Sequence, residues 1–173
     1  MQKHAFTLAT AILGVGLVVA CGSDKSTNPT NNNITYTATL AGANEKPTAV
    51  TTTATGTFTG TLNPTTNTFS WTLSFSGLTS NATLAHIHGP ADANTATGVI
   101  VNFASPTGGT GTLTTGATSG TASGSISLAG AVNASGTISG DSLKKLLDAG
   151  MVYANVHSAN FGAGEIRGQI HKQ

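Results

Sequence analysis

Apolar and polar side chains alternate with a period of two along most of the chain after residue 33. The clearest case is residues 69–75, where Phe, Trp, Leu and Phe occupy every second position and Ser or Thr lies between them. Successive residues of a β-strand point to opposite sides of a sheet, so this alternation predicts a strand with one buried face. Comparable patterns predict strands over residues 34–40, 56–62, 82–88, 99–103, 110–114, 120–128, 152–157 and 165–171.

One segment departs from this alternation. Residues 141–150, DSLKKLLDAG, predict a short helix because their three leucines share one face. Asp141 or Ser142 is expected to cap the start of this helix and Gly150 to end it. Many short strands, frequent turns and one helix predict an all-β fold, either an antiparallel sandwich or a Greek-key barrel.

The amino terminus predicts export and a lipid anchor. Lys3 and an apolar run over residues 5–20 precede Cys21, the single cysteine of the chain. These are signal-peptide features, and the sequence Val-Val-Ala-Cys-Gly resembles a bacterial lipobox, although an ordinary signal peptide or a buried helix is the alternative. The polar residues after Cys21 cannot bury a core and indicate a flexible tether. The expected organisation is a signal peptide over 1–20, a lipidated cysteine and tether over 21–33, and one β domain over 34–173.

Charge and motifs limit the function. The formal net charge is +1, and removal of Lys3 leaves six basic residues against six acids, so there is no basic surface for nucleic acid. No nucleophile elbow, phosphate loop or His-Glu-x-x-His motif occurs. Because Cys21 is assigned to the anchor, no cysteine nucleophile remains. We therefore expect a protein that is not an enzyme and does not bind nucleic acid.

The histidines and the single arginine gather in two separate segments. The alternation puts His86 and His88 on the side of their strand opposite Ile87. In the predicted strands over residues 152–157 and 165–171, the same alternation puts the polar residues on the side opposite the aliphatic residues. If the aliphatic residues fill the interior, this polar set lies on the solvent-facing layer of the fold. Its members are His86, His88, Tyr153, Asn155, His157, Glu165 and Arg167.

Two interpretations of this polar set remain open. His-x-His on a strand sets two imidazoles about 7 Å apart along the backbone. His157 from a neighbouring strand is then able to complete a copper or zinc site. The alternatives are ligand contact without a metal or a structural network. In that network the imidazoles bond to carbonyls, and Arg167 pairs with Glu165, Glu45 or a carbonyl.

Three ordered motifs resemble the CHRD domain, which is found in chordin and in many bacterial secreted proteins. They are YTATLAGANE at residues 36–45, AHIHGPA at 85–91, and NVH at 155–157 followed by GEIRGQ at 164–169. The resemblance implies an immunoglobulin-like β-sandwich and no settled activity. Lys46-Pro47-Thr48 and Gly162 depart from the usual residues of the family.

Three functions follow as hypotheses. The first is a lipid-anchored module of the cell envelope that binds an extracellular protein or polysaccharide. The second is a copper or zinc protein that uses His86, His88 and His157. The third is a passive structural component of the envelope. In each case we expect the membrane to be reached through the lipid on Cys21.

Overall fold

The computed structural model describes residues 32–173, so the predictions of a signal peptide and of lipidation at Cys21 lie outside the described residues. Every predicted strand is present, and the last one is divided in two. The strands are β1 (Ile34–Ala41), β2 (Thr55–Asn63), β3 (Thr68–Ser76), β4 (Ala82–His88), β5 (Val99–Asn102), β6 (Gly109–Leu113), β7 (Gly120–Ser127), β8 (Tyr153–Ser158), β9 (Ile166–Gln169) and β10 (His171–Lys172). A 3₁₀ turn, η1 (Gly42–Asn44), follows β1, and α1 (Gly140–Asp148) precedes β8.

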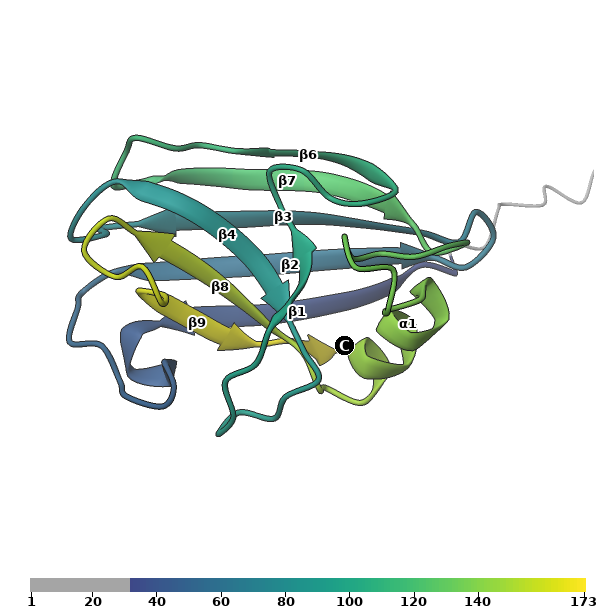
Figure 1. Ribbon diagram of the computed structural model, residues 1–173, viewed down its shortest axis with the longest axis horizontal. Helices are drawn as coiled ribbons and strands as arrows, with labels where there is room; N and C mark the ends of the chain where they lie inside the picture. The colour runs from purple at the N-terminus through teal and green to yellow at the C-terminus, as the bar shows by residue number, and fades with distance from the viewer. Residues whose placement is uncertain (1–31) are drawn as a thin grey trace, which may run out of the picture. The chain divides into compact units, whose positions relative to one another are not determined.

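The strands form one curled antiparallel sheet in the order β5-β4-β8-β9-β1-β2-β3-β7-β6, with β10 beside β1. The two edge strands, β5 and β6, follow one another in the chain and are joined by residues 103–108. The sheet therefore curls until its edges approach, and β4 and β8 cross over the strands β1 to β3 (Figure 1). An antiparallel β fold with one α-helix is thus confirmed. The immunoglobulin-like or Greek-key sandwich stays a prediction, because the hydrogen-bonded strands make a single sheet.

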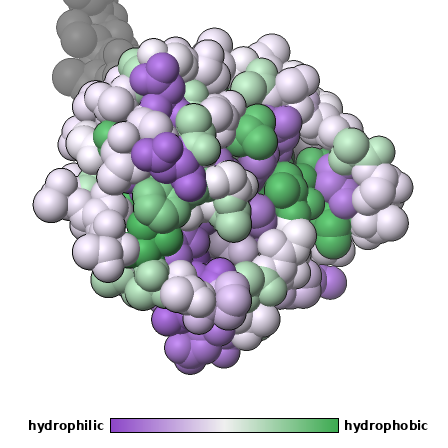
Figure 2. Space-filling view, turned by 60° about the vertical axis from the view of Figure 1, so that its left-hand side comes forward, coloured by the Kyte–Doolittle hydropathy of each residue, from purple (hydrophilic) through white to green (hydrophobic). Residues whose placement is uncertain are grey.

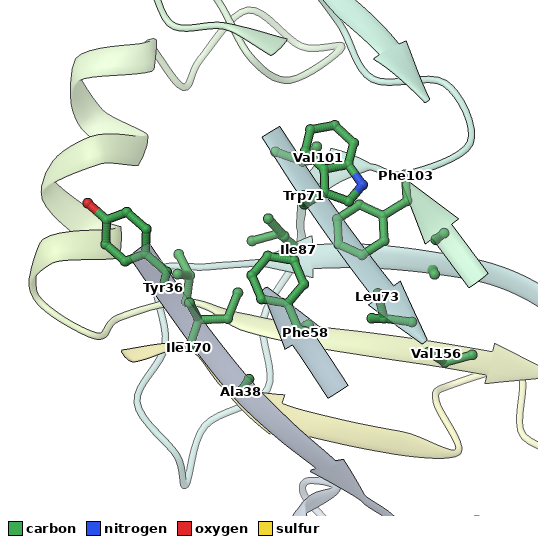
Figure 3. Packing of buried hydrophobic residues seen from close by; sticks show 14 of the residues in the cluster. Tyr36, Ala38, Phe58, Trp71, Leu73, Ile87, Val101, Phe103, Val156 and Ile170 are labelled. Carbon is green, nitrogen blue, oxygen red and sulfur yellow. The ribbon is translucent and has the colours of Figure 1, made fainter. Parts of the chain in front are cut away.

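Aromatic rings hold the two halves of the curled sheet together. Phe103, just after β5, stacks on Phe58 of β2 with 6.0 Å between ring centroids and on Trp71 of β3 with 5.2 Å. Ile87 of β4 is fully buried in the same cluster (Figure 3). The interior position of Trp71 and Ile87 confirms which side of each strand faces the core. Stacked aromatic pairs add to the free energy that their burial supplies.

Helix α1 begins at Gly140, slightly earlier than expected. Its N-cap is Ser139, whose hydroxyl accepts a hydrogen bond from the amide of Ser142, so the prediction of Asp141 or Ser142 as the cap was wrong. Ser139 has an extended backbone and precedes the first helical residue, which is what a capping side chain requires. Gly150 follows the helix with φ of +66°, a conformation that favours glycine. Within residues 32–173, the α-helix α1 is too short and too polar to cross a membrane.

Threonine and serine cover the outer face of the part of the sheet that β1, β2, β3, β7 and β6 form. The strand register aligns their side chains in rows that run across neighbouring strands. The rows are Thr35–Thr61–Ser70–Ser125–Thr110, Thr37–Thr59–Thr72–Ser123–Thr112 and Thr39–Thr57–Ser74–Thr121. The view in Figure 2, which brings forward the left-hand side of Figure 1, mixes residues of intermediate hydropathy with green hydrophobic and purple hydrophilic groups.

Candidate metal centre

Pairing of β4 with β8 brings the three predicted histidines together. Ile87 lies opposite Ala154, which places His86 beside Asn155 and Leu84 beside His157 on the other side of the sheet. One ring nitrogen of each histidine lies within 4.8 Å of the corresponding atoms of the other two. Two segments about seventy residues apart in sequence thus form one cluster, which we call the histidine cluster: His86, His88 and His157.

The histidine cluster is buried, so the expectation that it faces solvent was wrong. The exposed fractions of His86, His88 and His157 are 6%, 7% and 6%. The reason lies in two loops, residues 89–98 and 159–165, whose carbonyls contact the rings. Strand alternation states which side of a sheet a residue occupies, but it gives no information on what covers that side.

Backbone carbonyls fix the tautomers of two of the imidazoles. Nδ1 of His88 lies 2.9 Å from the carbonyl oxygen of Thr97, and Nδ1 of His157 lies 3.0 Å from that of Gly162. A carbonyl only accepts, so both rings carry their proton on Nδ1 and keep a lone pair on Nε2. Nε2 of His88 is buried and has no hydrogen-bond partner among the described residues. A buried lone pair without a donor costs free energy unless something binds it.

The third ring completes the cluster. Nδ1 of His86 lies 3.0 Å from Nε2 of His157, and because that nitrogen of His157 has a lone pair, His86 donates. For Nδ1 of His86 to serve as a ligand, the ring would adopt its other neutral tautomer, with the proton on Nε2. His86 also lines a hollow of about 440 Å³ with the polar residues Asn102, Ser105 and Asn133.

Burial keeps the cluster uncharged. Loss of hydration, together with repulsion from His157 and His88, lowers the pKa of His86 to about 3. Burial likewise lowers the pKa of His88 to about 4 and shifts the pKa of His157 downwards. All three imidazoles are therefore neutral near pH 7, which is the form that binds transition metals.

The cluster has nearly the dimensions of a metal site. Two nitrogens bound to one ion at about 2.0–2.1 Å each lie no more than about 4.2 Å apart. Three nitrogens around one ion lie closer, about 3.3–3.6 Å apart, so the limit of 4.8 Å implies a contraction of up to about 1.5 Å when an ion binds. Metal-binding histidines usually donate their other N–H to a carbonyl or carboxylate, as His88 and His157 do here.

Arg167 supports the cluster from one ring away. Its guanidinium carbon lies 3.5 Å from the centre of the Tyr153 ring, and Tyr153 stacks on His88. Its Nη2 donates to the carbonyls of Asp92 and Thr95 in the loop that covers His88. Of the expected partners for Arg167, the carbonyl is therefore confirmed, and neither Glu45 nor Glu165 forms an ion pair with it in the described part of the chain.

Glu45 and Asn155 form a second polar pair behind the cluster. Nδ2 of Asn155 donates to Oε1 of Glu45 at 2.8 Å, and both residues are buried. Burial raises the pKa of Glu45 to about 7, against the opposing effects of Arg167 and Asn155. Gly164, with φ of +131°, lies against the pair, and a Cβ there would lie 2.5 Å from Nδ2 of Asn155. Glycine at this position thus leaves room for the Glu45–Asn155 bond.

Glu165 does not join the cluster, contrary to expectation. Its carboxylate accepts hydrogen bonds from the hydroxyls of Thr52 and Ser158 and from the amide and hydroxyl of Thr79. Glu165 itself lies just before β9, where the strand side does not decide the direction of the side chain. The Glu165 carboxylate thus links Thr52, Thr79 and Ser158, which come from three separate segments, and it makes no hydrogen bond to a histidine of the cluster.

Sequence reasoning missed the contribution of the loop between β4 and β5 and the role of Tyr153. In this loop Asp92 and Asn94 make a turn in which Oδ1 of Asp92 accepts a hydrogen bond from the amide of Asn94. Tyr153 had a detectable signal, because it shares the strand side of Asn155 and His157. The positions of Thr97 and Gly162 had none, since only their backbone carbonyls act.

The chain belongs to the CHRD domain family, whose model matches residues 36–170. Neither the curated proteins nor the solved structures gave a significant match. The family is in general non-enzymatic, and it indicates a binding or interaction module.

Proposed function

We propose that this CHRD protein is a transition-metal-binding module of the cell envelope that holds copper or zinc with His86, His88 and His157. The observation that carries the proposal is the buried Nε2 of His88, which has a lone pair, lacks a hydrogen-bond donor among the described residues, and faces two further imidazoles. Nitrogen ligands of this kind suit copper and zinc.

A purely structural network explains the cluster less well. Buried polar atoms of Trp71, Asn155 and Gln169 also lack a partner, but Nε2 of His88 belongs to a ring that lies within ligand distance of two further imidazoles. Two rings are already oriented by carbonyls, so the cost of arranging ligands for an ion has been met during folding.

Calorimetric titration tests the site directly. The full chain, without a polyhistidine tag, is titrated with Zn(II) and Cu(II) and compared with a His86→Ala, His88→Ala double variant. We expect one ion per chain in the native protein and loss of this binding in the double variant. His171→Ala is the matched control, because His171 is exposed. Equal heats for the native protein and the double variant would reject the site.

We further propose that the module is tethered to a membrane by lipid on Cys21, facing the periplasm or the exterior. The support is the signal-peptide pattern of residues 1–20 and the polar stretch before β1. Mass spectrometry of the membrane fraction is expected to find a diacylated or triacylated Cys21, and a Cys21→Ser variant is expected in the soluble fraction. Recovery of an unmodified cysteine in the mature protein would contradict the anchor.

The hydroxyl rows favour a second candidate function, binding to a neutral envelope polysaccharide. The outer side of β1, β2, β3, β7 and β6 presents aligned Thr and Ser without a charged residue in the rows. Many of these hydroxyls are solvent-exposed and able to donate and accept, as sugar hydroxyls do. The chemistry of such a face matches a neutral polymer better than it matches a charged protein.

Pull-down on insoluble cellulose, insoluble chitin and purified envelope polysaccharide tests this second candidate. Thr59 and Thr72 lie side by side at the centre of the rows, so a Thr59→Glu, Thr72→Glu variant is expected to lose retention. An Asn94→Glu, Ser105→Glu variant adds the same charge at exposed positions away from the rows and is expected to bind normally. Retention that is equal in both variants would exclude the hydroxyl face.

A further inference from the structure

The histidine cluster contains no ligand that carries a negative charge. The group of potential ligands consists of three imidazoles, which are neutral when they bind a metal. The nearby acids are engaged elsewhere: Glu45 with Asn155, and Glu165 with hydroxyls of Thr52 and Ser158. An ion in the cluster therefore keeps its full charge.

The charged side chain stacked beside the cluster is positive. Arg167 lies over one face of Tyr153, and His88 stacks on the same ring. Both groups cannot occupy one face, so the order of the stack is Arg167, Tyr153, His88. The guanidinium is thus separated from a metal ligand by a single aromatic ring, and it repels a cation bound there.

Burial penalises a high charge on the ion. The three histidines are 6–7% exposed, so hydration contributes little to holding a cation. In the Born description the cost of burying an ion grows with the square of its charge, about fourfold from +1 to +2. Without a carboxylate or thiolate to offset this cost, the site favours the lower charge.

Coordination number leads to the same conclusion. Cu(II) prefers four or more nitrogen and oxygen ligands in a tetragonal arrangement. The cluster offers three nitrogens from two adjacent strands, and no fourth His, Cys, Asp or Glu joins it within residues 32–173. Cu(I) has a filled d shell, accepts three ligands and carries a single charge.

We propose that the histidine cluster selects Cu(I) over Cu(II), so that bound copper is held in the reduced state. This inference rests on the proposed metal-binding function and specifies its ion. The protein binds Cu(I) supplied as such, and no electron transfer by the chain itself is involved. In chemical terms the cluster is a site for storing or passing on cuprous ion.

Competition titrations on the full chain test the selectivity. Cu(I) affinity is measured anaerobically, with ascorbate as the reductant and bicinchoninate as the competing chelator, and Cu(II) affinity is measured with glycine as the competitor. We expect Cu(I) to bind at least about 100-fold more tightly than Cu(II). For a one-electron couple each tenfold ratio of affinities corresponds to about 59 mV, so the reduction potential of the bound copper lies about 120 mV above that of the unbound ion.

The variant Leu84→Glu tests the charge argument without disturbing the core. Leu84 is 44% exposed and lies directly opposite His157, on the same side of the sheet as the cluster. A carboxylate there supplies the missing negative ligand, so we expect the ratio of Cu(I) to Cu(II) affinity to fall at least tenfold. Thr83→Glu adds the same charge at the neighbouring exposed position and is expected to leave the ratio unchanged.

The outcomes separate the two proposals. Cu(II) bound as tightly as Cu(I), or Zn(II) bound where Cu(I) is not, would overturn the selectivity and leave the metal site standing. Equal shifts in Leu84→Glu and Thr83→Glu would overturn the role of local charge. Failure of Cu(I), Cu(II) and Zn(II) alike to bind in a histidine-dependent manner would overturn the proposed function itself.

Discussion

The ring of Tyr153 lies flat on the imidazole of His88, with 4.8 Å between the centroids and 2° between the planes. The two residues are direct neighbours across β8 and β4. The hydroxyl of Tyr153 also donates to the carbonyl of Thr97, the group that accepts the Nδ1 proton of His88. Tyr153 thus controls both the plane of the His88 ring and the carbonyl that sets its tautomer.

Replacing Tyr153 therefore tests how much the positioning of His88 contributes to metal affinity. We expect Tyr153→Leu to weaken Zn(II) binding about tenfold or more, the usual effect of losing a residue that orients a metal ligand. Tyr153→Phe keeps the stacking and loses only the hydroxyl, so its effect should be clearly smaller. Calorimetry on the folded variants measures both. Identical affinities for native and Leu variants would mean that the stack does not position His88.

Metal binding should depend weakly on pH down to about pH 5. For an exposed histidine with a pKa of about 6.5, the fraction of neutral imidazole falls about 25-fold between pH 7 and pH 5. Burial lowers the pKa of His86 to about 3 and of His88 to about 4, so these ligands stay neutral over that range. Zn(II) titrations at pH 7, 6 and 5 measure the effect. A steep loss of affinity between pH 7 and 6 would contradict the neutral buried cluster.

The metal-free protein should lose stability in acid. Below about pH 6.5 the unfolded chain takes up protons on His86 and His88, whereas in the folded chain His86 does so only near pH 3 and His88 only near pH 4. The unfolded state therefore binds more protons in this window, and the free energy of unfolding falls as the pH is lowered. Each histidine contributes up to about 1.4 kcal/mol per pH unit. Urea denaturation in the presence of a chelator, from pH 7 to pH 5, measures the slope.

Glu45 acts in the opposite direction and gives a separate test. Its pKa of about 7 in the folded chain means that folding takes up a proton between pH 7 and the ordinary carboxyl range near 4.3. Glu45 therefore adds stability as the pH falls and partly offsets the histidines. Glu45→Gln keeps an oxygen acceptor for Asn155 and removes the titration. We expect a steeper acid loss in this variant by up to about 1.4 kcal/mol per pH unit, and an unchanged slope would contradict the raised pKa.

Local pattern determines most of the fold. Alternation located the strands, most clearly β2 and β3, in which buried and exposed residues alternate, and the leucines of residues 141–150 located the helix. The order of the strands was not predictable, since the pairing of β4 with β8 depends on contacts distant in sequence. The cap at Ser139 was missed because Asp141 and Ser142 are equally good capping residues, and only the backbone conformation distinguishes them.

The site was predictable only in part for a similar reason. The strand sides of His86, His88 and His157 follow from period two, and their convergence follows from the pairing of two strands. Burial by the loop carbonyls of Thr97 and Gly162 has no sequence signal, because any residue supplies a carbonyl. Of the three expected partners of Arg167, formal charge favours Glu45 or Glu165, but the backbone carbonyls of Asp92 and Thr95 are the groups that accept its hydrogen bonds.

The aromatic contact that joins the two halves of the sheet should dominate stability. Phe103 is fully buried and stacks on both Phe58 and Trp71, so Phe103→Ala leaves a cavity that neighbouring rings cannot fill. We expect a loss of about 3–5 kcal/mol in the free energy of unfolding. Leu84→Ala, at an exposed position, is the control and should cost much less, within about 0.5 kcal/mol.

Because Phe103 directly follows Asn102, the strand partner of His86, the Phe103→Ala variant should also loosen the histidine cluster. Hydrogen exchange at the β4 amides measures that coupling, and unchanged protection of His86 and His88 would show that the core and the histidine cluster are mechanically independent.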